Sequence, residues 1–155
     1  MVTMQENHTI VHVLQNLGNA MLVQADRHQL VALQFAAQGF SKLGRKYQEH
    51  AEEERGFAQQ MFNRVLDLGG QLFLTEQEAA DLPETPLEWL KEELEISRSG
   101  LKEILPIVQA AADDITTYDI LKDYYKDEEE DLYWTEQQLD LIEAIGYQNW
   151  LTRQI

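Results

Sequence analysis

An unbroken acidic run, Asp127 to Asp131, lies in a segment whose apolar residues recur at helical spacing. Successive helical residues are turned by about 100°, so five in a row encircle the axis and at least one carboxylate points toward the core. The apolar stripe from Tyr125 to Leu132 selects Glu128, and Asp131 lies three residues on along the same side. A bare carboxylate on a core stripe is costly to bury, so each needs a metal ion, another cation or a proton.

A second inward carboxylate is predicted at Glu54, which occupies a core position in another helical stripe. His28 lies on the stripe of the first helical segment, two turns beyond Met21, and is expected to face the same layer. Carboxylate and imidazole groups are ligands for divalent transition metals. We therefore predict a metal site made of Glu54, Glu128, Asp131 and His28, enough for one ion and poor for two. The alternative is a metal-free polar patch, in which the carboxylates share a proton or pair with His28.

Length and composition limit the class of protein. The chain has 155 residues, no cysteine and a formal net charge of −16, which together suit a single domain over residues 1–155 without disulfides or thiol chemistry. This charge argues against nucleic acid and anionic membranes as partners, although acidity alone is also explained by solubility. The start of the chain has no secretory signal pattern and no run is long enough to span a membrane, so a cytoplasmic location is expected.

Apolar periodicity predicts four long helices and a short fifth segment, at about 9–38, 41–68, 86–111, 115–145 and 147–155. Gly39, Gly69 and Gly146 are expected to end helices, and Ser41 to cap the second. Thr85 followed by proline is typical of the start of a helix, here the third. These elements leave no strand signal, so the predicted fold class is all-α.

The connection between the second and third helices, about 71–84, is too long for a tight turn between antiparallel neighbours. The other connections are short and favour antiparallel hairpins. Two hairpins joined by one long crossover form a four-helix bundle of the ferritin type rather than a simple up-down-up-down bundle. The predicted architecture is therefore a ferritin-like bundle with a crossover between helices two and three and a short C-terminal fifth helix.

The end of the chain, KDEEEDLYWTEQQLDLIEAIGYQNWLTRQI, resembles the C-terminal part of bacterioferritins. There an acidic E-x-x-H segment is followed by a Trp, an L-D-L-I run, a Gly, Q-N and a short terminal helix. The segment EHAEEERGFAQQMFNRVLDLGG is similar to the second helix of bacterioferritins and ferritins. The resemblance extends over nearly the whole chain. It implies a cage of 24 subunits storing ferric mineral, a di-iron ferroxidase centre in each bundle, and haem held at a two-fold interface by a Met.

The family's di-iron centre takes a Glu from the first helix, Glu-x-x-His from the second, a Glu from the third and Glu-x-x-His from the fourth. The resemblance places these ligands, in that order, at Met21, Glu54, Phe57, Ser97, Glu128 and Asp131. Only Glu54 and Glu128 keep the family's residue, and Asp131 is a candidate substitute ligand. The haem Met falls at Arg55, which cannot be an axial ligand, so haem is not expected and iron is the candidate cofactor.

These observations predict an iron-storage or iron-binding cage subunit with a degenerate ferroxidase centre. Its expected partners are iron ions and other subunits, in a homo-oligomer between a dimer and a 24-subunit cage or in a hetero-oligomer with a competent bacterioferritin subunit. Two alternatives stay open. One is an active ferroxidase with an atypical centre of one or two metals built on His28, Glu54, Glu128 and Asp131. The other is a structural or interaction bundle that binds no metal.

Overall fold

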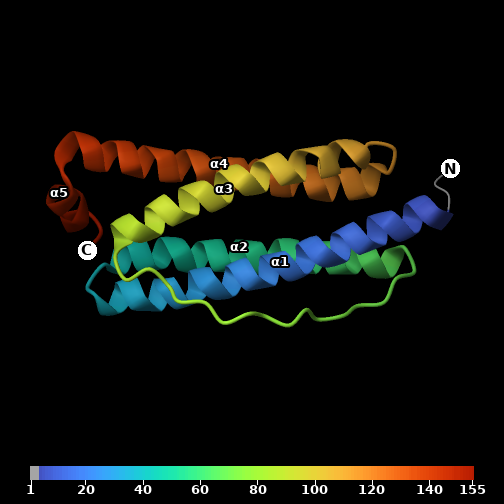
Figure 1. Cartoon of the computed structure of the whole chain (residues 1–155), viewed down its shortest axis with the longest axis horizontal. Helices are drawn as coiled ribbons and strands as arrows, with labels where there is room; N and C mark the ends of the chain where they lie inside the picture. The colour runs from blue at the N-terminus through green and yellow to red at the C-terminus, as the bar shows by residue number, and fades with distance from the viewer. Residues whose placement is uncertain (1–3) are drawn as a thin grey trace.

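The computed structural model describes residues 4–155, with side chains from residue 9 onward, and consists of helices and connections (Figure 1). The five helices are α1 (Met4–Ala37), α2 (Ser41–Asp67), α3 (Pro86–Ala110), α4 (Ile115–Ile145) and α5 (Tyr147–Thr152). The described part of the chain has no strand. The predicted all-α fold with four long helices and a short fifth is confirmed.

The helices pair as two hairpins, α1 with α2 and α3 with α4, and the crossover between α2 and α3 runs along the length of α1 (Figure 1). Polar side chains of α1 hold this crossover in place. Asn19 donates to the Phe73 carbonyl at 3.1 Å and accepts from the Thr75 backbone N–H at 2.9 Å. Further along α1, the side-chain amide of Gln34 donates to the Pro83 carbonyl at 2.7 Å. The long connection is therefore a structural strap rather than a free loop.

The predicted glycine ends and the Thr85 cap are confirmed, whereas the Ser41 cap is wrong and α1 begins at Met4 instead of about residue 9. Gly39, Gly69 and Gly146 have φ values of 97°, 83° and 86°, in the left-handed region that glycine adopts most readily. The Thr85 hydroxyl accepts from the Glu88 backbone N–H, as expected for the N-cap of α3. The prediction that Ser41 caps α2 is wrong. Its N-cap is Phe40, whose carbonyl already accepts from the Gly44 N–H at 2.9 Å, so the helical hydrogen bonds begin one residue earlier.

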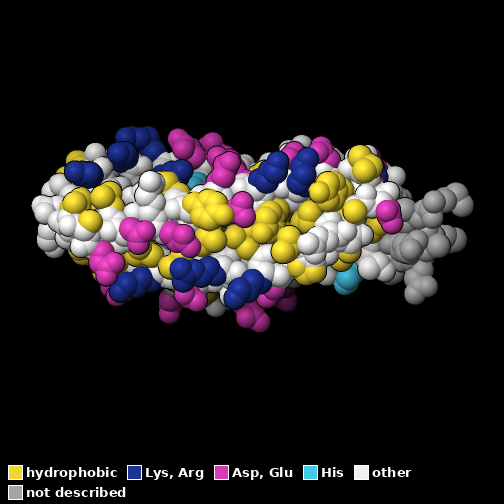
Figure 2. All heavy atoms as spheres, turned by 90° about the horizontal axis from the view of Figure 1, so that it is seen from above, with side chains coloured by type: hydrophobic (Ala, Val, Ile, Leu, Met, Phe, Trp, Pro, Cys, Tyr) yellow, Lys and Arg dark blue, Asp and Glu magenta, His cyan; other side chains and the backbone are white. Residues whose placement is uncertain are grey.

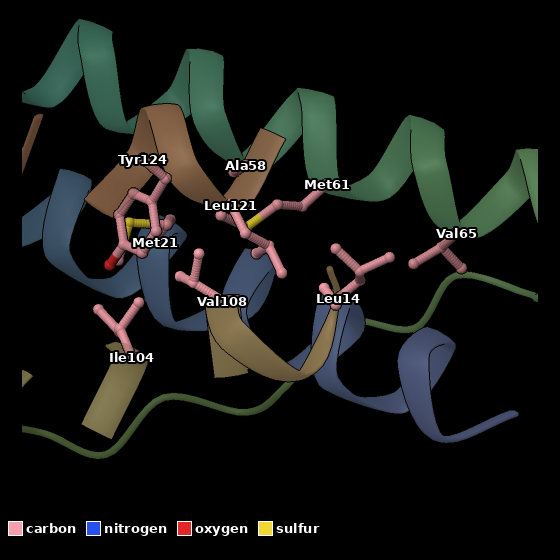
Figure 3. Close-up of a cluster of buried hydrophobic side chains, with 10 residues drawn as sticks. Leu14, Met21, Ala58, Met61, Val65, Ile104, Val108, Leu121 and Tyr124 are labelled. Carbon is pink, nitrogen blue, oxygen red and sulfur yellow. The ribbon is translucent and has the colours of Figure 1, made fainter. Parts of the chain in front are cut away.

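The apolar core consists of two clusters at opposite ends of the bundle rather than one continuous stripe. The first, drawn in Figure 3, is formed by Leu14, Met21, Ala58, Met61, Val65, Ile104, Val108, Ala111, Leu121 and Tyr124. The second is formed by Val31, Ala32, Phe35, Leu43, Tyr47, Trp89, Leu90 and Trp150. Between the two clusters, each long helix carries polar residues, and this polar layer is the candidate functional site.

Hydrophobic, acidic and basic side chains are mixed on the outer surface. In the view of Figure 2, acidic and basic groups alternate along the edges of the bundle, with hydrophobic side chains between them. The exposed large hydrophobic residues on α3 and α4 are Leu105, Ile115 and Tyr133. None of the described helices combines the length and the apolar character needed to cross a membrane.

Replacing Asp114 should weaken the α3–α4 hairpin. Its carboxylate accepts from the Thr117 N–H at the start of α4 and pairs with Arg64 of α2 at 2.9 Å. These bonds lower the pKa of Asp114 against the raising effect of burial. Asp114→Ala is expected to reduce the free energy of unfolding by about 1–2 kcal/mol. Urea unfolding at fixed protein concentration measures the loss, with exposed Asp113→Ala as the control. Equal losses in the two variants would contradict a capping role.

Candidate functional site

A histidine of α1 lies between two carboxylates at the middle of the bundle. The Nδ1 atom of His28 contacts Oε1 of Glu54 from α2, and its Nε2 atom lies 2.7 Å from Oε2 of Glu93 from α3. The three side chains are nearly inaccessible, with exposed fractions of 6%, 2% and 7%. One imidazole ring therefore connects three helices. We call this group the histidine clamp.

Helical spacing puts each clamp residue in line with buried apolar positions on its own helix. Glu54 lies between Ala51 and Ala58, three and four residues away, and both alanines are buried. His28 likewise follows Ala25 by three residues, and Glu93 follows Leu90 by three. The clamp is thus a polar layer inserted between the two apolar clusters. Aromatic rings pack around it, with those of Tyr47 and Trp89 each 5.6 Å from the ring of His28.

The clamp carries its own positive charge. Burial by itself lowers the pKa of His28, but the charge of Glu93 and the hydrogen bonds to Glu54 and Glu93 outweigh it and raise that pKa to about 10. Both ring nitrogens face carboxylate oxygens, which favours the doubly protonated imidazolium. Glu93 also accepts from Nη1 of Arg27 at 3.2 Å, and the guanidinium of Arg27 lies 4.9 Å from the Trp89 ring centre. Two protein cations therefore compensate the buried acids.

Glu54 and Glu128 are two acids of this layer whose pKa values are raised by burial. Burial raises the pKa of Glu54, although the hydrogen bond from His28 opposes this, and Oε2 of Glu54 has no hydrogen-bond partner. Burial, Glu54 and Asp131 raise the pKa of Glu128 well above its usual value. The layer thus disfavours a further bare charge on Glu128.

A second acidic group lies between α2 and α4. Oxygen atoms of Glu53, Asp127 and Asp131 all lie within 4.8 Å of one another. Burial and the neighbouring carboxylates raise the pKa of Asp127 to about 6 and that of Asp131 to about 8. His50, which is 4% exposed, places its Nε2 atom 3.4 Å from Oδ1 of Asp131. We call Glu53, Asp127, Asp131 and His50 the α2–α4 acidic group.

The structure distributes three of the four predicted site residues over these two groups, and Glu128 belongs to neither. Glu54 is buried, as predicted, and contacts His28; Glu128 is partly buried, and Asp131 faces His50. Among the residues whose side chains are described, the one trio of possible ligands within 4.8 Å of one another is Glu53, Asp127 and Asp131. No three of the four predicted ligands meet that closely. A metal held by His28, Glu54, Glu128 and Asp131 therefore stays a prediction.

Four residues of these two groups were missing from the predicted site: Glu93, His50, Glu53 and Asp127. Glu93 follows Leu90 by three residues and precedes Ser97 by four, so it satisfies helical spacing as well as the neighbouring Leu94. Apolar character favours Leu94 for the core, yet the structure buries Glu93 more deeply. A signal was available, since a buried His28 needs hydrogen-bond partners on both ring nitrogens.

Arg55, which the resemblance aligns with the family's haem ligand, points across to α1. Its Nη2 atom donates to Oδ1 of Asp26 and to Oε1 of Gln29, each at 2.7 Å. The crossover joins this contact, because Gln77 donates to Oδ2 of Asp26 at 3.0 Å. The guanidinium therefore has a structural role between α1 and α2.

An all-α bundle of two hairpins, one long crossover and carboxylates projecting inward from several helices defines the class of ferritin-like proteins. A profile of the ferritin-like domain matches residues 12–145, and the chain belongs to this family. The chain is 31% identical to the bacterial ferritin of Neisseria meningitidis serogroup B (strain MC58), over 98% of this chain and 100% of that protein. It is 30% identical to the bacterial ferritin of Pseudomonas aeruginosa and 28% identical to that of Synechocystis, over the same 98% of its length.

The histidine clamp should make the protein less stable in alkaline solution. The pKa of His28 is about 10 in the folded chain and about 6.5 when unfolded. Its contribution is therefore fully present below about pH 6.5 and is lost as pH rises through about 10. One proton held only by the folded state makes the free energy of unfolding fall by about 1.4 kcal/mol per pH unit in this interval. Urea unfolding at several pH values between about 7.5 and 9.5 measures the slope.

His28→Gln tests whether the clamp causes this slope. At neutral pH the variant should lose about 3–5 kcal/mol, because it leaves two buried carboxylates without their cation. Between about pH 8.5 and 9.5 its stability should change less steeply than that of the wild type. Exposed His12→Gln is the matched control and should retain the wild-type slope. Parallel curves for the wild type and His28→Gln would show that the ring is not a buried cation.

Proposed function

We propose that this chain is an iron-binding subunit of a bacterioferritin-like cage whose own ferroxidase centre is degenerate. The observation that carries the proposal is the histidine clamp. Glu54, one of the two glutamates that the resemblance retains, already binds the imidazolium of His28. A protein cation thus occupies the contact that the resemblance assigns to iron.

The other positions of the resembled centre fit two irons equally poorly. Met21 lies in the apolar cluster of Figure 3, and Phe57 packs against the same cluster and lies edge-on to Tyr124, 5.7 Å between ring centres. Ser97 is buried and offers no carboxylate. These side chains supply packing where the resembled centre has hard oxygen and nitrogen ligands. We therefore assign no oxidation step to this layer.

The proposed role is to bind Fe(II) and ferric ions as cargo and to supply acidic surface for mineral growth. Its support is the formal net charge of −16 together with membership of the ferritin-like family. Oxidation would then come from a competent bacterioferritin subunit in a mixed cage. Haem has no place in this proposal, because the position of the haem ligand is occupied by Arg55 and its partners on α1.

Aerobic Fe(II) oxidation by the purified protein tests the degenerate centre. We expect the wild type to oxidise Fe(II) no faster than a protein-free solution, because the clamp and the apolar replacements leave no di-iron ligand set. The rate is followed by the absorbance of the ferric product. Glu128→Ala should leave this background unchanged, as should the exposed control Glu130→Ala. A wild-type rate well above background that is lost in Glu128→Ala alone would favour the atypical ferroxidase instead.

Sedimentation velocity tests the cage separately. The protein is expected to sediment as a large closed assembly, either alone or after co-expression with a competent bacterioferritin subunit. Iron loading of the mixed assembly should then exceed that of this chain alone, because only the mixed assembly contains an oxidising centre. A species no larger than a dimer in every condition would count against a cage and leave the structural bundle as the better interpretation.

A further inference from the structure

We propose that a basic pocket beside the start of α2 binds an oxyanion of the phosphate class. The structure contains a cavity of about 390 Å³ between the beginning of α2, α4 and the C-terminal segment. Its lining includes Lys42, Arg45, Lys46, Glu49, Trp134 and Gln154, and we call it the basic pocket. The pocket shares no residue with the histidine clamp or the α2–α4 acidic group, so the inference does not rest on iron binding by either.

The basic pocket concentrates positive charge in an acidic chain. Three cations and one carboxylate line it, whereas the whole chain has a formal net charge of −16. Among the ion pairs of the described residues, none includes Lys42, Arg45 or Lys46. Arg27 and Arg64, by contrast, pair with acids of neighbouring helices. The pocket therefore offers cationic donors whose acceptors are not supplied by the chain itself.

The start of α2 adds to this positive potential. The N-terminus of a helix carries the positive end of its dipole, where acidic side chains are favoured. The first turn of α2 has no acidic residue and contains Lys42, with Arg45 and Lys46 one turn further along. This order of charges is unfavourable for the helix itself, and an anion bound in the pocket would relieve it.

Lys46 is held in place by the aromatic wall of the pocket. Its ammonium lies 4.9 Å from the ring centre of Trp134, a cation–π contact, and that ring packs edge-on against Tyr47 at 6.0 Å. Burial raises the pKa of Asp131 and the charge of Lys46 opposes this, so α4 partly compensates Lys46. Lys46 thus shapes the pocket, while the exposed Lys42 and Arg45 supply most of the charge that a ligand would meet.

The C-terminal segment forms the other wall of the pocket. The backbone N–H of Lys42 donates to the Gln154 carbonyl at 2.9 Å, and the side-chain amide of Gln154 donates to the Trp150 carbonyl at 3.1 Å. Both Gln154 and Trp150 are buried. The C-terminus therefore lies at the end of the bundle where α2 begins (Figure 1). Three segments that are distant in sequence thus fix the shape of the pocket.

The lining selects the kind of ligand. Three cations against Glu49 leave two excess positive charges, which match a phosphate dianion. The guanidinium of Arg45 presents a planar fork that fits phosphate oxygens, and a lysine ammonium binds them as a point charge. A cavity of about 390 Å³ is in the size range of small-molecule sites. It has room for a second phosphate or for a small ester, and the phosphate group is what these ligands share.

Isothermal titration calorimetry of the purified full-length protein tests the pocket, with pyrophosphate, inorganic phosphate and AMP in separate titrations. We expect saturable binding of pyrophosphate at about one per chain, weaker at high salt because charges at an exposed site are screened. The double variant Lys42→Gln/Arg45→Gln should bind about 5–30-fold more weakly, as two surface charge contacts are lost. Glu49→Gln should bind more tightly, because it removes the one carboxylate that faces the anion.

The three titrations also distinguish the sources of the phosphate group. Binding of AMP at least as tight as that of inorganic phosphate would assign the pocket to phosphate esters. Weaker binding of AMP would assign it to free phosphates. Both results support an oxyanion site at the start of α2.

Lys91→Gln/Lys102→Gln on α3 is the matched control, because both lysines are exposed and the change in net charge is the same. Intrinsic fluorescence gives a local readout, since Trp89 and Trp150 are 0% exposed and a change on adding pyrophosphate therefore reports Trp134.

Thermal unfolding shows that a loss of binding is not a loss of folding. Lys42→Gln/Arg45→Gln removes positive charge from the start of a helix, so its melting temperature should equal or exceed that of the wild type. Added pyrophosphate should raise the melting temperature of the wild type more than that of this variant. Absence of saturable binding in all three titrations, or equal weakening in this variant and in the α3 control, would overturn the proposal.

Discussion

The need to neutralise buried carboxylates constrains the whole middle of this bundle. Glu54 and Glu93 enter the core from different hairpins, and each would be strongly destabilising there as a bare charge. The ring of His28 contacts both, so a single cation joins α1, α2 and α3. Arg27, the residue before His28, pairs with Glu93, and its guanidinium lies over the Trp89 ring. The hairpins are therefore held in register by charge as well as by apolar packing.

The division of the core follows from this layer. Apolar residues fill both ends of the bundle, where Met21 and Phe57 belong to one cluster and Tyr47 and Trp89 to the other. A bundle that binds two metals at its centre needs polar ligands on both sides of the ions. Here the middle layer holds the ring of His28 with Glu54 and Glu93, while Met21 and Phe57 belong to the neighbouring apolar cluster. Membership of the ferritin-like family thus fixes the scaffold, while the residues at its centre determine the chemistry.

Sequence periodicity was sufficient for the fold and for part of the site. The long helices, the crossover and the inward position of Glu54 all follow from residue spacing and turn residues, which act locally along the chain. Glu93 could not be chosen over Leu94 in that way, because both satisfy the helical period and only the neighbouring helix decides which is buried. The approach of His50 to Asp131 likewise depends on how α2 packs against α4. Contacts between helices are therefore the part that spacing alone cannot supply.

The clamp and the α2–α4 acidic group are linked through their histidines. The rings of His28 and His50 lie 5.7 Å apart, nearly edge to face. Burial lowers the pKa of His50 to about 3, and the positive charges of His28 and Lys46 contribute to this shift. Two imidazolium ions this close would repel each other strongly in a poorly solvated interior. Burial, with the charge of His28 as a second contribution, therefore favours a neutral ring at His50. The two neighbouring rings therefore differ in charge: His28 compensates the buried acids, and His50 stays neutral.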